Sequence, residues 1–471
     1  MHLGIDLGTS SVKALLVEGD RAVAEAAAPL TVERPRDGWA EQDCESWVDA
    51  TRAAVAALGA DLSALRGIAI AGHMHGACLV GADGTALRPC LLWNDTRAHA
   101  EAADWDDAEA RAITGNIVFP GFTAPKVEWV RRHEPEVFAA TRLVLLPKDY
   151  LRLRLTGEAW SEMSDASGTA WLDVGARDWS DALLARSGLT RDHMPRLAEG
   201  SAPTARVSAE GARRTGLPAG VAVAGGAGDN AAAAVGTGAV APGRGFVSLG
   251  TSGVLFASSA SYDPDPETAV HTFCHAVPGT WHQMGVILAA TDALEWAARL
   301  TGRDAAALAA APPGPPGRAL FLPYLGGERT PHADAGLRGA LLGIEHATDA
   351  AALGRAVMEG VAFALRDCLD ALEATGTTVG PLLAVGGGAR SEAWLRIVAN
   401  ALGRPLEVPA GAAHGAALGA ARLARMADGA GPEIAAPPPV ERVVEPDAAL
   451  AEAYAAGLAR FRTAHAATRG V

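Results

Sequence analysis

The sequence reads GIDLGTSSV at residues 4–12 and FVSLGTSGV at residues 246–254. Each copy is a short apolar strand, a Leu-Gly-Thr-Ser bend and a second apolar strand. Such a bend presents backbone N–H groups and hydroxyls to an anion, and two of them could grip a polyphosphate. The copies differ at one chemically important position, because Asp6 in the first is Ser248 in the second. One carboxylate suffices to help hold a magnesium ion. The repeat therefore predicts a two-domain ATP clamp built by duplication.

Length and charge narrow the class of protein. At 471 residues, two or three domains are expected rather than one core. An apolar fraction of 49% is typical of a globular protein. The net charge of −14, with no block of Lys and Arg to offset it, disfavours nucleic acid as a partner.

Cysteine usage and the lack of an apolar span indicate the compartment. Five cysteines are scattered and never show Cys-x-x-Cys spacing, which predicts free thiols in a reducing cytosol. No basic-then-apolar signal segment opens the chain. The longest weakly polar stretch, residues 215–228, is interrupted by Pro218 and is too rich in Gly to span a bilayer. We expect a cytoplasmic protein with no membrane partner.

The order of expected elements is similar in the two halves. The first half predicts strands at residues 3–7, 12–17, 21–28 and 67–71 and a helix at 45–57. The second predicts a hairpin at 245–256, a helix at 349–374 capped by Thr348 or Asp349, a strand at 382–385 and an Ala-rich helix at 447–468. Loops rich in Gly and Pro are expected at 236–245, 311–317 and 429–439. The first of these loops divides the chain into an N-terminal domain, residues 1–243, and a C-terminal domain, residues 244–471.

The first strand places Asp6 for ligand binding. Leu3, Ile5 and Leu7 share one face of this strand, and Gly4 and Asp6 share the other. Asp6 lies at the carboxyl end, where ligands of α/β sheets usually bind, and Gly4 leaves space beside it.

The glycine-rich motifs exclude one nucleotide-binding mode and suggest another. None of the lysines follows a glycine, so no G-x-x-x-x-G-K-[ST] motif exists, and an ATP site here is not a P-loop. Residues 386–388 are three glycines that join a strand to a helix which Ser391 can cap. A nucleoside or phosphate can lie against such bare backbone. A tight left-handed turn explains the glycines equally well.

Asp229 is the candidate general base. It follows an apolar strand and the glycine-rich run 225–228, where the backbone can turn toward a second molecule. A carboxylate suits the removal of a proton from a phosphoryl acceptor. Capping of a helix that starts near Ala231 is an equally good explanation. Residues 226–231 also fit G-x-G-x-x-A, but no acidic residue follows before Asp263, so a dinucleotide fingerprint is discounted.

Residues 72–76, Gly-His-Met-His-Gly, follow another strand. The side chains of His73, Met74 and His75 could contour a polar small molecule, although a packed turn is the simpler explanation. Zinc binding there or at residues 271–275 is disfavoured because the paired ligand spacing is missing. Trp93 could be core or the rim of a sugar site.

Together these motifs resemble the FGGY family of carbohydrate kinases over nearly the whole chain. The segment around Lys126 and Trp129 fits the first signature of the family, whereas the second is partly met, with Ala351-Ala352 where a polar residue is usual. The resemblance rests on residues 4–10, 72–76, 92–95, 114–116, 120–129, 146–150, 228–230, 248–253, 327–332, 339–344 and 386–391.

The resemblance implies a fold, two ligands and a role for each site residue. The fold would be α/β, a duplicated actin-like (ribonuclease H-like) ATPase with two domains flanking a cleft that binds ATP and Mg²⁺. Asp229 would deprotonate the sugar hydroxyl, and Asp6 would position magnesium. The sugar would contact Met74, His75 and Asn230. Residues along the phosphates would be Gly8, Thr9, Ser10, Lys13, Gly250 and Thr251, with Gly387 and Gly388 beside the nucleoside.

Within the family, the enzymes that phosphorylate D-xylulose are the most similar, so the expected reaction is ATP-dependent conversion of D-xylulose to D-xylulose 5-phosphate. His73 stands where those enzymes often have Gln. The alternatives are a kinase for another ketose or a polyol, such as ribulose or glycerol, and a non-metabolic clamp of the actin and chaperone type. The partners are thus a small sugar and ATP, and a homodimer is left open because the Ala-rich C-terminal helix can pack on its own domain or on a second copy.

Overall fold

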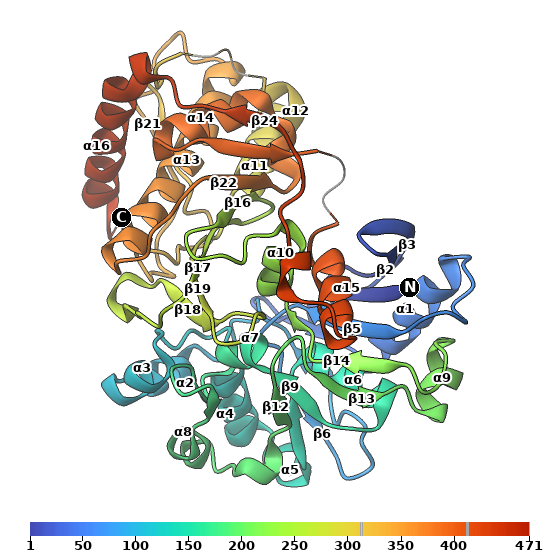
Figure 1. The fold of residues 1–471 in the computed structure, drawn as a ribbon. Coiled ribbons are helices and arrows are strands. Elements are labelled where there is room, and N and C mark those ends of the chain that lie inside the picture. The colour runs from blue at the N-terminus through green and yellow to red at the C-terminus, as the bar shows by residue number, and fades with distance from the viewer. Residues whose placement is uncertain (311, 313, 411–413, 471) are drawn as a thin grey trace. The chain divides into compact units, whose positions relative to one another are not determined.

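The computed structural model of the chain describes residues 1–310, 312, 314–410 and 414–470. They fold into two compact units, each of which is discontinuous in sequence (Figure 1). The first unit is Met1–Val240 with Phe273–Trp281 and His414–Pro437, and the second is Ala241–Thr272 with His282–Ala413 and Pro438–Val471. The boundaries of these units differ from the predicted division between residues 243 and 244. That division concerns the two halves of the sequence, and it stays a prediction.

The first unit is built on a mixed sheet whose hairpin was expected from the sequence. Strands β1 and β2 pair antiparallel, with Asp6 opposite Lys13, and β1 runs parallel to β5, with Asp6 beside Ala71. The short strand β15 pairs with the end of β5. The strands in sheet order are β13 (Pro203–Arg206), β14 (Ala222–Ala224), β5 (Gly67–Gly72), β1 (His2–Leu7), β2 (Ser11–Glu18) and β3 (Arg21–Pro29), with β15 (Ala227–Gly228) off this path.

The second sheet repeats this pattern. Its hairpin pairs β16 with β17 antiparallel, and β16 runs parallel to β22, with Ser248 beside Val385. Both sheets thus carry a hairpin, two parallel neighbours and an antiparallel edge strand in the same order, which confirms the predicted duplication. The strands in order are β18 (His271–Cys274), β19 (Trp281–Ile287), β17 (Gly253–Ser259), β16 (Gly245–Leu249), β22 (Leu382–Val385), β23 (Leu406–Pro409) and β24 (Val440–Val444).

Two helices pack on β1. On one face, Leu3, Ile5 and Leu7 join a core with residues of α1 (Cys44–Ala57). On the other face lies α15 (Gly415–Ala427), so close that a Cβ on Gly4 would be 1.9 Å from the Ala417 carbonyl oxygen. The space expected beside Asp6 at Gly4 is therefore filled by helix backbone.

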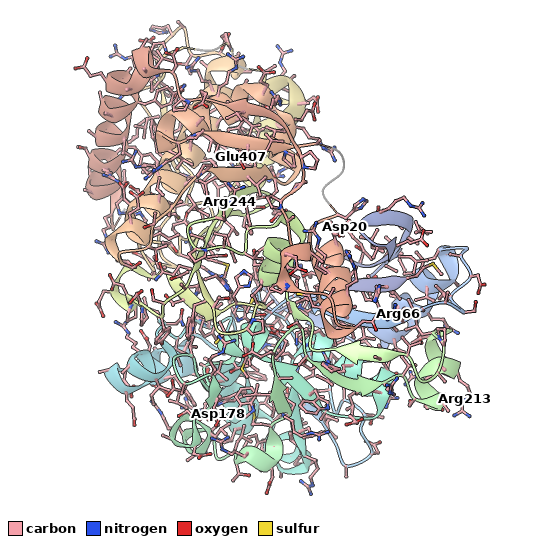
Figure 2. The ribbon with its side chains drawn as sticks, in the orientation of Figure 1. Asp20, Arg66, Asp178, Arg213, Arg244 and Glu407 are labelled. Atoms are coloured by element: carbon pink, nitrogen blue, oxygen red, sulfur yellow. The ribbon has the colours of Figure 1, made fainter. Side chains whose placement is uncertain are left out.

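Helix α15 belongs to the first unit although it lies late in the sequence. It crosses α10 (Asp229–Thr237) through small residues, and a Cβ on Gly419 would be 1.8 Å from the Ala232 carbonyl oxygen. Figure 2 labels Asp20 and Arg66, which both pair with α15: Asp20 binds Arg425, and Arg66 lies 2.9 Å from Asp428 just past the helix.

Shorter elements complete the first unit. Its other helices are α2 (His99–Trp105), α3 (Ala108–Thr114), α4 (Thr123–His133), α5 (Pro135–Ala140), α6 (Pro147–Thr156), α7 (Met163–Ala166), α8 (Asp181–Arg186) and α9 (Ala209–Thr215). Its short strands pair as β4 (Glu41–Gln42) with β7 (Cys90–Leu91), β6 (Cys78–Val80) with β8 (Leu143–Leu145), β9 (Trp160–Glu162) with β12 (Arg196–Ala198), and β10 (Leu172–Asp173) with β11 (Asp178–Trp179).

The core of the second unit gathers around α13 (Ala350–Ala374), which the sequence predicted to within one residue. Asp349 caps it by accepting a hydrogen bond from the Ala352 N–H, as one of the two expected caps. Its apolar face, including Val357, Val361 and Leu365, is fully buried. The remaining elements are α11 (Thr291–Thr301), α12 (Ala305–Leu308), α14 (Glu392–Leu402), α16 (Ala451–Thr468) and the pair β20 (Leu320–Leu322) with β21 (Ala340–Leu342).

The C-terminal region differs from expectation in two details. The final helix begins at Ala451 rather than Asp447, because a 3₁₀ turn at Ala448–Leu450 precedes it. Strand β24 follows directly on the expected loop 429–439 and was not predicted, since Glu441 and Arg442 stand side by side and interrupt its apolar residues. Residues 311 and 313 of the expected loop 311–317 lie outside the described residues, whereas the Gly314 carbonyl accepts a hydrogen bond from Arg355 at 2.7 Å.

Candidate active site

The first hairpin holds its bend with backbone and side-chain hydrogen bonds. The Gly8 N–H donates to the Ser11 carbonyl at 3.0 Å. Thr9 accepts twice: its carbonyl from Gln42 Nε2 and its hydroxyl from Trp93 Nε1, each at 3.0 Å. Trp93, predicted as core or sugar-site rim, is half-buried and its indole N–H contacts the first hairpin. The side chains of Ser10 and Lys13 are exposed and available to a ligand.

Asp229 begins helix α10 but does not cap it. The N-cap residue is Gly228, and the Asp229 carboxylate accepts hydrogen bonds from the N–H (2.7 Å) and Nδ2 (3.0 Å) of Asn230. The capping explanation for Asp229 is therefore not supported. Its second carboxylate oxygen makes none of these bonds.

The negative charge of Asp6 acts on the carboxylate of Asp229. Asp6 on β1, Ala71 on β5 and Ala227 on β15 lie in register across the sheet, and Asp229 follows two residues later. Burial, and second the negative charge of Asp6, raise the pKa of Asp229 to about 6. Burial also raises the pKa of Asp6, although Lys13 opposes this. These two half-buried carboxylates have the exposed Lys13 as a counter-charge. A divalent cation would further stabilise their ionised forms.

Met74 and His75 lie beside the candidate base. A Cβ on Gly228 would be 3.0 Å from the Met74 sulfur, so Met74 packs directly on the residue before Asp229. His75 Nδ1 bonds the Gly168 carbonyl at 2.8 Å, and its ring stacks on Phe122 with centroids 4.8 Å apart. His75 has a φ of 70°, a left-handed conformation that non-glycine residues rarely adopt. The turn thus holds its side chains in fixed positions.

His73 plays a different part from its neighbours. It is buried edge-on against Trp47, with ring centroids 5.9 Å apart, and burial lowers its pKa to about 4. Its backbone N–H donates to the Leu7 carbonyl at 3.0 Å, which ties the end of β5 to the end of β1. Of the described residues, no group of three or more His, Cys, Asp and Glu is arranged to hold a metal ion.

The second hairpin is secured by a different loop. The N–H groups of Ala290 and Thr291 donate to the carbonyls of Thr251 (2.8 Å) and Gly250 (2.9 Å). These bonds use carbonyls of the bend and none of its N–H groups. The Thr251 side chain is exposed. The neutral Ser248 occupies the penultimate position of its strand, as Asp6 does in the first hairpin.

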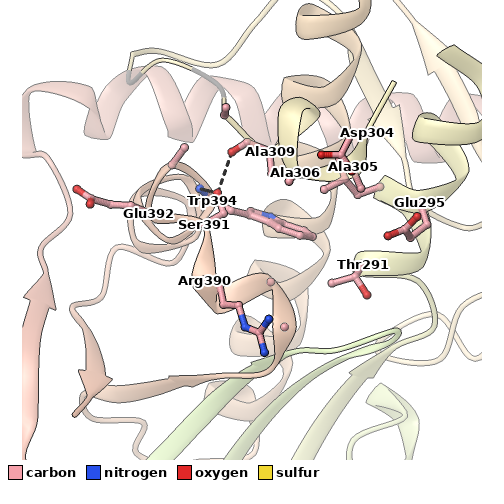
Figure 3. Close-up of a pocket in the computed structure, with 15 residues that line it drawn as sticks. Thr291, Glu295, Asp304, Ala305, Ala306, Ala309, Arg390, Ser391, Glu392 and Trp394 are labelled. Carbon is pink, nitrogen blue, oxygen red and sulfur yellow. Dashed lines mark hydrogen bonds between the residues drawn. The ribbon is translucent and has the colours of Figure 1, made fainter. Parts of the chain in front are cut away.

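A cavity of about 700 Å³ opens beside the glycines that follow β22 (Figure 3). Gly387 and Gly388 line it, and a Cβ built on Gly387 would meet no atom within 4 Å. The opposite wall comes from α11 and α12, with Thr291, Glu295 and Ala306 among its residues. The wall is fixed by Ser391, whose hydroxyl donates to the Ala309 carbonyl at 2.8 Å while also capping α14.

The predicted site residues thus fall into two sets. The structure brings Asp6, Asp229, Asn230, Met74 and His75 together in the first unit. In the second unit, the N–H of Thr291, a residue of the cavity wall, donates to the Gly250 carbonyl at 2.9 Å and so ties the second hairpin to that wall. Sequence analysis missed the α11 and α12 wall, because its Ala-rich segments carry no motif. It also missed a buried cluster of charged side chains that includes Lys148 and Asp149, although both residues lie in the motif at 146–150.

In the described part of the chain, no helix combines the length and apolar character that crossing a membrane requires.

Comparison with known proteins identifies the family. Residues 1–236 match the N-terminal domain of the FGGY family of carbohydrate kinases, and residues 245–427 match its C-terminal domain. A xylulose kinase from Escherichia coli K12 is 48% identical over 478 residues, covering 98% of each chain.

Solved structures agree with this match. A crystal structure described as a xyloylose kinase from Brucella ovis superposes with a TM-score of 0.96 at 54% identity, covering 99% of this chain and 98% of that one. A xylulose kinase structure from Rhodospirillum rubrum gives a TM-score of 0.90 at 32% identity, with coverage of 99% and 98%. The predicted duplicated, actin-like α/β fold is confirmed, and the match favours a kinase over a non-metabolic clamp. The chain belongs to the FGGY family of carbohydrate kinases.

Proposed function

We propose that this chain transfers the γ-phosphate of MgATP to D-xylulose, giving D-xylulose 5-phosphate and ADP. The observation that carries the proposal is the 48% identity, over 98% of both chains, to the Escherichia coli xylulose kinase. The match covers 98% of this chain, so the similarity extends through both halves of the sequence rather than through one motif.

Asp229 acts as the general base. Its carboxylate takes the proton of the attacking sugar hydroxyl, the oxygen forms a bond to the γ-phosphorus, and the bond to the β-phosphate oxygen breaks to release ADP. Support comes from the pKa of about 6, which leaves the carboxylate mostly ionised at neutral pH yet basic enough to accept a proton. Asn230, by donating two hydrogen bonds to one carboxylate oxygen, fixes the direction of the other.

Asp6 is the residue that would hold magnesium, and the cation would neutralise charge on the phosphates during transfer. The exposed Ser10 and Lys13, with the N–H group of Thr9, contact phosphate oxygens. Gly8, whose own N–H is bonded to the Ser11 carbonyl, has no side chain and lets the phosphates approach the bend. Gly250 and Thr251 act in the same way in the second unit. The nucleoside occupies the cavity lined by Gly387 and Gly388, which is large enough for a purine ring and ribose.

Met74, His75 and Asn230 bind the sugar. Their support is positional: Met74 packs against Gly228, and His75 is held by Gly168 and Phe122. A ring nitrogen and an amide supply hydrogen bonds to hydroxyls, and the thioether supplies an apolar contact with the carbon chain.

The test is ADP release with MgATP and a panel of acceptors: D-xylulose, D-ribulose, L-ribulose, L-xylulose, glycerol, gluconate and no sugar. Selective turnover with D-xylulose, lost in Asp229→Ala, is the expected result. Preference for another acceptor would keep the kinase and change its substrate. Turnover that ignores every sugar would overturn the proposal.

We also propose a cytoplasmic location, supported by the five cysteines, which are all buried free thiols. A homodimer remains a prediction, and sedimentation velocity would decide it.

A further inference from the structure

A short segment of the first unit contacts both the residue before the base and the sugar-side residues. This segment, Glu162–Gly168, runs from the end of β9 through α7 into a 3₁₀ turn. Its residues Ser164, Ser167 and Gly168 are buried, and the mechanism above uses only Gly168, whose carbonyl holds His75.

The segment binds the peptide that precedes the base. The Gly228 N–H donates to Ser164 Oγ at 3.0 Å in a buried position. The Ser164 hydroxyl in turn donates to the Glu162 carboxylate, 2.9 Å from Oε2, and the Ser164 N–H donates to the same oxygen at 2.7 Å. Both functions of the hydroxyl are used, so the bonds form a directed chain from Gly228 through Ser164 to Glu162.

A buried cluster of charges anchors this chain. Lys148 Nζ lies 2.6 Å from Asp149, 3.4 Å from Asp165 and 3.6 Å from Glu162, and all four side chains are fully buried. Arg152, also buried, donates to the Ala224 carbonyl at 2.7 Å and to the Gly225 carbonyl. The cluster therefore holds the strand that leads to Asp229 as well as Glu162. A buried carboxylate is stable only with such compensation.

The other end of the segment holds the sugar-side residues. The Gly168 carbonyl accepts from His75 Nδ1, and a Cβ on Gly168 would lie 2.4 Å from that ring and 3.2 Å from Met74 Cε. Met74 is thus wedged between Gly168 and Gly228. One rigid segment sets the position of the base relative to the substrate residues.

We propose that Ser164 is a positioning residue for phosphoryl transfer, which fixes the Gly228 peptide and through it the Asp229 carboxylate against the sugar. The inference rests on the proposed function, because it takes Asp229 as the base. Without the hydroxyl, the Gly228 N–H has no acceptor in this buried position, and the backbone can shift. Displacement of a reacting group by about 1 Å can cost about 100-fold in rate.

Ser164→Ala tests this, with Ser161→Ala as the matched control. Ser161 donates a buried hydroxyl to Asp149 at 2.6 Å in the same cluster but makes no bond to Gly228. We expect kcat to fall between about 10- and 100-fold in Ser164→Ala, with the KM for ATP nearly unchanged. Ser161→Ala should keep kcat within about twofold, even if both variants lose similar thermal stability.

A double variant separates positioning from general damage. If Ser164 acts through Asp229, then Ser164→Ala should change the residual rate of Asp229→Asn by less than about twofold. Ser164→Cys keeps the side-chain volume with a weak hydrogen-bonding group and should also lose kcat, so it serves if the alanine variant does not fold.

Near-normal kcat in Ser164→Ala or Ser164→Cys, equal losses in Ser161→Ala, or multiplicative losses in the double variant would each overturn the inference. These outcomes differ from failure of the proposed base, which would appear as an active Asp229→Asn enzyme.

Discussion

The two hairpins share a sequence and a topology but not a charge. In both, a strand ends in Leu-Gly-Thr-Ser and pairs with an antiparallel return strand on one side and a parallel strand on the other. In the first, Asp6 faces Lys13 across the hairpin, whereas in the second Ser248 faces Val254. Duplication therefore kept the backbone that can bind phosphate and left a charged side chain in one copy.

The helices that follow the sheets differ in the same way. Helix α10 follows β15 and begins with Asp229, while α15 follows β23 and begins with Gly415. Both carboxylates of the proposed mechanism thus belong to the first copy. The comparison indicates that both copies of a repeated backbone can serve a ligand with repeated groups, such as a polyphosphate. Proton transfer needs one base, so its side chain is present in one copy alone.

Removing the base should have the largest effect. Asp229→Asn keeps the size of the side chain but cannot accept the sugar proton, so kcat should fall by about 10²- to 10⁴-fold. The rate of ADP formation with saturating D-xylulose measures this. The matched control is Asp349→Asn in the second copy, where Asn caps α13 as well as Asp does and activity should persist.

Exchanging the hairpin residues should have the next largest effect. Asp6→Ser makes the first hairpin resemble the second, and the loss of a carboxylate ligand should weaken the apparent Mg²⁺ affinity at least about 10- to 100-fold. A magnesium titration of the initial rate provides the measurement. Adding Ser248→Asp to this variant should not restore it, because the base lies beside Asp6. Recovery in the double variant would show that the copies are interchangeable.

Replacing the bend threonines, Thr9 and Thr251, should lower stability by slightly different amounts in the two copies. Thr9→Val removes the acceptor of the Trp93 indole N–H, which should cost about 1 kcal/mol. Thr251→Val removes an exposed hydroxyl and should change stability by less than about 0.5 kcal/mol. Thermal unfolding without nucleotide should show a melting temperature about 1–2 °C lower for the first variant alone. Equal shifts would contradict the difference in environment.

Local patterns were sufficient to predict much of the fold. The alternation of Leu3, Ile5 and Leu7 gave β1, and the spacing of apolar residues with Asp349 before them gave α13. Strand β24 was missed because Glu441 and Arg442 interrupt its apolar residues, and an edge strand buries little. The return of α15 to the first unit depends on contacts between Gly4 and Ala417 that only the folded chain creates.

The site residues divide in the same way, into those that a sequence motif predicts and those that only the folded chain reveals. Glycines and carboxylates at strand ends marked Asp6, Asp229 and Gly387, because their chemistry is visible in the motif. Ser164 carries no such signal, since a serine on a four-residue helix matters only through the Gly228 peptide, 64 residues away in sequence. Positioning residues of this kind follow from packing and were beyond the sequence alone.

The dependence of kcat/KM for D-xylulose on pH tests the charged, asymmetric site most directly. Asp229 must be ionised to accept a proton, and its pKa is raised to about 6 by burial and by Asp6. With MgATP and D-xylulose both far below KM and no excess Mg²⁺, the rate reports the enzyme before a cation neutralises Asp6, and kcat/KM should fall toward tenfold per pH unit below about pH 6. In Asp6→Asn the same decline should begin at lower pH, because one cause of the raised pKa is gone. A rate that stays level to pH 5, or a decline that does not move in Asp6→Asn, would contradict the account.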